Sequence, residues 1–163
     1  MSMILYLKRV EAAGPDELRT SITDPQEFMF GDSDNSRLVD FDKAWMAIMH
    51  VLTQFPDLAA PAKALFIGTG GTSVSSDPGY GPAIYISPKV AGVLKAGLDR
   101  LSNDELKQRY DPEAMEREYV YCADIFTHEP VEGWRYLAHG LDKLRRFLTD
   151  CSESESGVVK LLV

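Results

Sequence analysis

The chain has β-strand-like segments near both of its ends, and most of the sequence between them has helical periodicity. Residues 2–10 (SMILYLKRV) and 158–163 (VVKLLV) are rich in the apolar and β-branched side chains that strands favour. Residues 63–67 (KALFI) and 83–86 (AIYI) predict two further short strands. The order strand, helices, strands, helices, strand predicts an α+β fold. We expect a small mixed β-sheet that includes the N- and C-terminal strands and is packed with several helices.

The firmest helix prediction covers residues 39–55 (VDFDKAWMAIMHVLTQF). Trp45 and the apolar residues three, four and seven positions after it form one stripe. Asp40 and Asp42 lie at the predicted helix start, where the partial positive charge of a helix end favours acidic side chains. Pro56 is expected to end this helix. Capping signals predict further helix starts at Asp24-Pro25, Ser87-Pro88, Ser102 and Asp111-Pro112.

Length and composition indicate one domain spanning residues 1–163. The chain has 45% hydrophobic and 26% charged residues, as ordinary globular proteins do. The apolar run near the N-terminus is too short for a secretory signal or for a membrane span, which needs about 20 residues. The two cysteines, Cys122 and Cys151, form no CxxC pair. We therefore expect a cytoplasmic protein with no membrane association, no disulfide and no metal held by cysteine.

The charge is negative and unevenly distributed. The net charge of −8 disfavours nucleic-acid binding, which needs a basic surface. Residues 11–42 contain nine acidic side chains and only two basic ones. Such a segment can attract a basic protein partner, and it can equally be a solvated surface. The candidate partner-binding residues within it are Asp32, Asp34, Asp40 and Asp42.

Complete metal and catalytic motifs are missing from the sequence. The run GDSDNSRLVDFDK starts like a calcium-binding EF-hand loop with Asp32 and Asp34, but Arg37 replaces the central glycine and Lys43 replaces the final glutamate. The HEPVE stretch at residues 128–132 lacks the second histidine of a zinc protease motif. The sequence therefore predicts no metal and no cofactor. It favours a non-catalytic protein, with an enzyme left open.

Residues 68–82 form a glycine-rich stretch that follows an apolar segment. GTGGT at residues 68–72 has no lysine for a phosphate loop, and Ser73 stands where a dinucleotide fingerprint needs its third glycine. Gly70 and Gly71 are typical of a turn. Together with Tyr80 and Tyr85, they predict a shaped loop at the rim of a ligand or partner site.

Several short motifs, spread over nearly the whole chain, resemble one known family. They are MSMILYLKRV at the N-terminus, VDFDKAW at residues 39–45, YGPAIYISP at 80–88, LDRL at 98–101 with DELK at 104–107, and the last leucine-rich helix with its apolar strand. This set is similar to the YfbM-like family of bacterial proteins, whose function is unassigned. The resemblance implies a one-domain α+β fold and a cytoplasmic protein, and it supplies no catalytic residues.

Two hypotheses from different classes remain open at this point. In the first, the chain is a non-catalytic binding module that recognises a basic protein through its acidic segment and loop 69–82, as an immunity protein neutralises a toxin. The alternative is a small-ligand-binding protein or enzyme with its site between loop 68–82 and the Trp45 helix. The sequence leaves the oligomeric state open.

Overall fold

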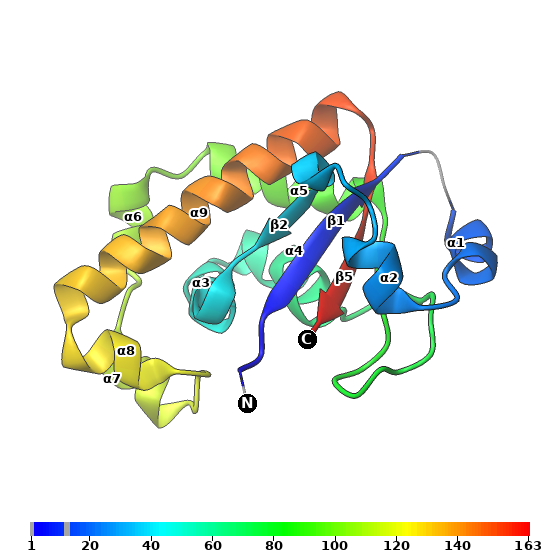
Figure 1. Cartoon of the computed structure of the whole chain (residues 1–163). Helices are drawn as coiled ribbons and strands as arrows, with labels where there is room; N and C mark the ends of the chain where they lie inside the picture. The colour runs from blue at the N-terminus through cyan, green and yellow to red at the C-terminus, as the bar shows by residue number, and fades with distance from the viewer. Residues whose placement is uncertain (1, 12–13) are drawn as a thin grey trace.

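The computed structural model describes residues 2–11 and 14–163. Within these residues, five strands form one sheet in the order β2-β1-β5-β4-β3. The strands are β1 (Leu5–Val10), β2 (Leu38–Asp40), β3 (Thr72–Ser73), β4 (Ile84–Ile86) and β5 (Gly157–Leu162). β1 and β5 lie side by side, with β5 at the centre of the sheet (Figure 1). The predicted sharing of one sheet by the N- and C-terminal strands is confirmed.

The helices occupy most of the chain between β1 and β5. The described residues contain α1 (Pro15–Ser21), α2 (Pro25–Phe30), α3 (Trp45–Thr53), α4 (Pro56–Ile67), α5 (Pro88–Asp99), α6 (Asn103–Lys107), α7 (Pro112–Arg117), α8 (Ala123–His128) and α9 (Pro130–Glu153), with short 3-10 turns at Asn35–Arg37 and Asp42–Ala44. None of these helices is long and apolar enough to cross a membrane.

Local capping signals explain where several helices begin. The Asp24 carboxylate accepts hydrogen bonds from the backbone N–H groups of Gln26 and Glu27, at 2.8 and 3.0 Å, and so caps α2. Ser102 and Glu105 form the reciprocal capping box at the start of α6. These starts lie where the sequence predicted them. So do the starts of α5 and α7, each of which has proline at its first position.

The sheet separates two apolar layers. On one face, Leu5 and Leu7 of β1 pack with buried residues of the larger helices, among them α3, α4, α5 and α9. On the other face, Val159 and Leu161 of β5 pack against α1 and α2 through residues such as Leu18. Figure 1 shows α1 and α2 on one side of the sheet and the long α9 running across the other. The alternation of neighbouring residues in β1 and β5 between these layers is the period of two expected of strands.

The α+β class is confirmed, and two details of the prediction are wrong. Residues 63–67 (KALFI), predicted as a strand, form the last turns of α4. The Trp45 helix ends at Thr53, ahead of Pro56 as predicted, and Pro56 occupies the first position of α4. Gly68 ends α4 with a φ of +78°. A short apolar run has no period of its own, so its flanking residues decide its structure. All four described strand pairs are antiparallel, so the sheet is not mixed.

Candidate functional site

A pocket of about 500 Å³ lies where the glycine-rich loop meets α4 and α5. We call it the glycine-loop pocket. Its walls come from four segments of the chain: Ala60, Pro61 and Ala64 of α4; residues 69–72; Tyr85, Ile86 and Ser87 at and after β4; and Lys89, Val90 and Val93 of α5. Most of these side chains are apolar. Lys89 is the one charged residue of the lining.

The glycines allow the loop to lie directly on β4. A side chain at Gly71 would place its Cβ 2.4 Å from Cγ2 of Ile84 and 2.9 Å from the backbone oxygen of Tyr85. Gly68 and Gly70 have φ values of +78° and +76°, which side chains other than glycine resist. The glycines of this stretch therefore shape the wall of a pocket.

The rest of the loop is ordered by its own hydrogen bonds. β3 pairs with β4 through Thr72 and Tyr85, and the N–H of Val74 donates to the Ala83 carbonyl at 2.9 Å. The Asp77 carboxylate accepts from the N–H groups of Gly79 and Gly81 at 2.7 and 2.8 Å. The predicted loop thus contains a short strand and a turn fixed by a carboxylate.

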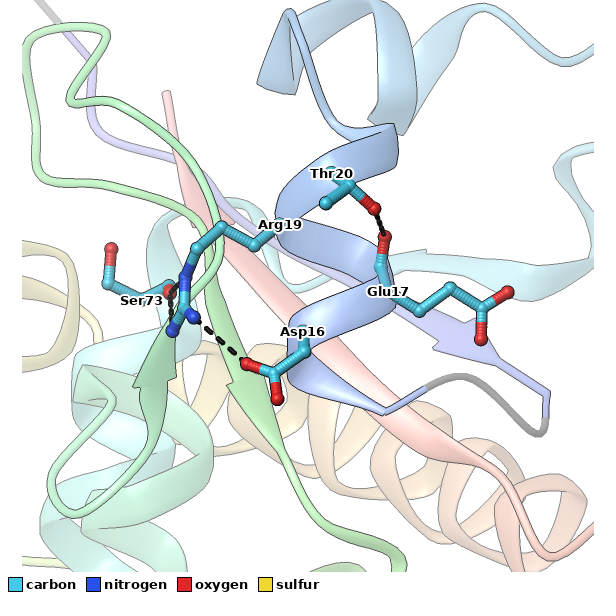
Figure 2. A network of polar contacts seen from close by, with 5 residues as sticks. All are labelled: Asp16, Glu17, Arg19, Thr20 and Ser73. Atoms are coloured by element: carbon cyan, nitrogen blue, oxygen red, sulfur yellow. Dashed lines mark hydrogen bonds and ion pairs between the residues drawn. The ribbon is translucent and has the colours of Figure 1, made fainter.

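Helix α1 fastens the loop to the acidic segment, as Figure 2 shows. The Arg19 guanidinium donates to the Ser73 carbonyl at 3.2 and 3.4 Å and forms an ion pair with Asp16 at 3.0 Å. On the same helix, the Thr20 hydroxyl donates to the backbone carbonyl of Glu17 at 2.8 Å. Arg19 of this segment therefore forms intramolecular bonds with the loop and with Asp16, on the surface of the molecule.

The structure places the two predicted loop tyrosines differently. Tyr85 lines the glycine-loop pocket, and its ring packs against Gly157, where a Cβ would come within 2.5 Å of it. Tyr80 lies further along the loop, is 38% exposed and is not part of the lining. Gly70, Gly71 and Tyr85 are thus brought together at the pocket.

Trp45 is part of the core. Its side chain is 5% exposed, its Nε1 donates to the Met3 carbonyl at 3.2 Å, and its ring lies 6.4 Å from that of Tyr121. The lining of the glycine-loop pocket contains no residue of α3. At this pocket it is α4, and not the Trp45 helix, that faces the loop.

Asp40 and Asp42 serve the chain reversal between β2 and α3. The Asp40 carboxylate accepts from the N–H of Asp42 at 3.1 Å and lies 3.7 Å from Nζ of Lys143. Asp42 has a φ of +46°, and its carboxylate accepts from the Tyr136 hydroxyl at 2.8 Å. That hydroxyl accepts in turn from the N–H of Lys43 at 3.0 Å. Burial, reinforced by the bond to Asp42, raises the pKa of Tyr136.

Asp32 and Asp34 also have partners inside the molecule. Asp32 pairs at 2.9 Å with Lys8, whose side chain is buried beneath α2 and also donates to the Phe28 carbonyl. Asp34 accepts from the N–H of Ser36 at 2.9 Å, and this bond lowers the pKa of Asp34. Each of the four predicted partner-binding aspartates therefore has its own partner within the chain: Lys8 for Asp32, the N–H of Ser36 for Asp34, Lys143 for Asp40 and Tyr136 for Asp42.

Sequence reasoning missed the wall of the pocket that α4 supplies. Ala60, Pro61 and Ala64 were outside every candidate set, since the end of α4 was predicted as a strand. Lys89 follows the predicted helix start at Pro88, so its place near the loop could be predicted from the sequence. Among the described residues, no group of three or more histidine, cysteine or acidic side chains is arranged to hold a metal ion.

Comparison with known proteins agrees with this architecture. The family described as "Domain of unknown function (DUF1877)" matches residues 1–160. The crystal structure of YfbM from Escherichia coli, a protein of unknown function, superposes with a TM-score of 0.63 and 13% sequence identity, covering 98% of this chain and 99% of that one. No curated protein matches the chain. The chain therefore belongs to the DUF1877 family and has the fold of YfbM, which confirms the YfbM-like resemblance.

Proposed function

We propose that the glycine-loop pocket binds a small, mostly apolar molecule that carries one negative charge. The pocket itself is the observation that carries this proposal. Its volume of about 500 Å³ falls within the range of about 300–1,000 Å³ typical of ligand sites. Such sites combine apolar walls with a few polar groups that orient the ligand. Two helices, a strand and a loop supply those walls here, which favours a preformed site.

The polar groups of the lining support the charge of the ligand. Lys89 is positive, and the lining contains no acidic residue. The Ser87 hydroxyl makes no capping hydrogen bond at the start of α5, which leaves it available to a bound molecule. Thr69 and Thr72 add two hydroxyl groups at the loop. A carboxylate beside an apolar body matches this combination.

A thermal-shift screen of aliphatic and aromatic carboxylates, each beside its neutral amide, tests the proposal. A ligand at 100 times its Kd stabilises the folded state by about 2.7 kcal/mol. For a chain of this length that raises Tm by about 5–10 °C. Carboxylates should raise Tm more than their amides, and NMR shift changes should centre on the lining residues. A screen without any stabilising compound would refute the proposal.

Matched variants locate the binding. Ala60→Trp fills the pocket from α4, whereas Ala96→Trp adds the same side chain to an exposed position of α5 outside the lining. Lys89→Met removes the charge of the pocket, and Lys63→Met removes an exposed charge elsewhere. We expect Ala60→Trp to abolish the ligand-induced shift and Lys89→Met to erase the preference for carboxylates, with both controls unchanged. Equal effects of the two tryptophan variants would place the binding elsewhere.

Recognition of a basic protein through residues 11–42, as in an immunity protein, is our second candidate. The acidic excess of the segment supports it. The intramolecular partners of its carboxylates weigh against it: Lys8 pairs with Asp32, Arg19 with Asp16 and Lys143 with Asp40. Charge reversal at Glu17 and Glu27, which are exposed residues in the first turns of α1 and α2, tests this candidate without disturbing those ion pairs. Unchanged capture of every partner by this variant would reject it.

A further inference from the structure

The central strand of the sheet contains a buried lysine. Lys160 of β5 has only 7% of its surface exposed and is paired in register with Leu7 of β1 and Ile84 of β4. Side chains of directly paired residues lie on the same face of a sheet. Lys160 therefore lies between two apolar side chains, on the face that the larger helices cover.

The ammonium group of Lys160 has no hydrogen-bond or ion-pair partner among the residues that the structure describes. Lys8, which is 6% exposed, provides the contrast, because it donates to the Phe28 carbonyl and to Asp32. A buried charge without a partner is costly, and a lysine can avoid that cost by releasing its proton. Burial accordingly lowers the pKa of Lys160.

The amine still reaches the surface of the molecule. The buried polar atoms without a partner in the described chain are Nε of Arg9 and Nδ1 of His50, and Nζ of Lys160 is not among them. Ile84, beside Lys160, packs against Gly68 and Gly71 of the loop. Because only 7% of the residue is exposed, we expect access for a small reagent only.

We propose that Lys160 is a nucleophilic amine that condenses with small, uncharged aldehydes to form an imine. Its nitrogen lone pair attacks the carbonyl carbon, and a C–N bond forms. The carbonyl oxygen then leaves as water, taking up the two protons that the amine loses. No electrons are exchanged with a second reagent. The apolar neighbours Leu7 and Ile84 select a neutral carbonyl compound over a keto acid. This site is separate from the glycine-loop pocket and does not depend on a ligand there.

Competitive labelling at pH 7 tests this proposal. The folded protein is treated with a limiting amount of acetaldehyde and cyanoborohydride, which reduces the imine to a stable ethylamine, and the labelled peptides are quantified by mass spectrometry. We expect Lys160 to be labelled several times faster than the exposed Lys63, while Lys8 stays unlabelled. In urea the three lysines should react at similar rates, because unfolding removes the special environment.

Lys160→Met separates reactivity from folding. Methionine is an apolar side chain of similar length, so the variant should still unfold in one cooperative thermal transition, at a Tm no lower than that of the wild type, and should lose the rapidly labelled site. Labelling of Lys160 at or below the rate of Lys63 in the folded protein would overturn the proposal. So would an unchanged rapid phase in Lys160→Met, since the reactive amine would then be another lysine.

Discussion

Two glycines of α5 provide a matched pair that tests the packing of the pocket wall. Gly92 and Gly97 both lie inside the helix Pro88–Asp99. A Cβ at Gly92 meets nothing within 4 Å. A Cβ at Gly97 would lie 2.1 Å from Cδ2 of Leu58, which is 1% exposed on α4. The same substitution by alanine therefore has opposite expected effects at two positions five residues apart.

The magnitudes follow from two opposing contributions. Replacing glycine by alanine inside a helix stabilises the folded state by about 1 kcal/mol. Gly92→Ala should gain this amount, which raises Tm by about 2–4 °C for a chain of this length. Gly97→Ala gains the same amount but has to displace Leu58 in a packed core, which costs about 1–3 kcal/mol or more. We expect a net loss of up to about 2 kcal/mol for this variant, since Leu58 is 1% exposed in a close-packed core.

Urea unfolding at constant pH, with calorimetry as a second measurement, distinguishes these outcomes. A third variant tests the mechanism: in a Leu58→Ala background the clash is absent, so Gly97→Ala should become stabilising. Equal stabilisation by Gly92→Ala and Gly97→Ala in the wild-type background would refute the close approach of α4 and α5. The proposed pocket walls would then be misplaced as well.

Three further predictions concern side chains outside the pocket. Tyr136→Phe removes the hydroxyl that links Asp42 to the start of α3 and should cost about 1–2 kcal/mol in chemical denaturation, with little further loss when Asp42→Ala is added. Trp45→Phe should cost about 2 kcal/mol through the lost bond to Met3 and the space left in the core, as measured by thermal unfolding. Lys160→Met should be more stable than the wild type at neutral pH, because methionine carries no buried charge. The pKa of Lys160 in the folded state lies below 10.5, so the free energy of unfolding of the wild type increases as pH rises from that pKa towards 10.5. The stability difference between Lys160→Met and the wild type should therefore shrink over this pH range. A difference that does not change with pH would contradict the reasoning.

Local signals predicted the parts of the fold that depend on few residues. The caps at Asp24, Ser102 and Asp111 each require only a side-chain oxygen and a nearby backbone N–H, and they were found from sequence. The short strands β2 and β3 were missed because two or three residues have no measurable alternation and depend on β1 and β4 to pair with them. Residues 63–67 were misassigned for a similar reason, as their helical start lies seven residues earlier at Pro56.

The candidate site was predicted in part. The glycine loop was identified because Gly70 and Gly71 are unusual next to an apolar run, and Tyr85 follows in the next strand. Its opposite wall depends on which helix packs against the loop. Tertiary packing determines that helix, and the local sequence of the loop does not. The acidic aspartates were identified by charge alone. Charge in sequence does not show that Lys8 and Lys143, from distant segments, neutralise Asp32 and Asp40.

The central place of β5 determines when the sheet can form during synthesis. β1 pairs with β2 on one side, but on its other side it requires residues 157–162, as does β4. While these residues are still inside the ribosome, both strands present open hydrogen-bonding edges, which are prone to aggregation. The core layers therefore close only after residue 162 has left the exit tunnel. A nascent chain stopped short of β5 should be a substrate for chaperones and proteases, even when its helices have already formed.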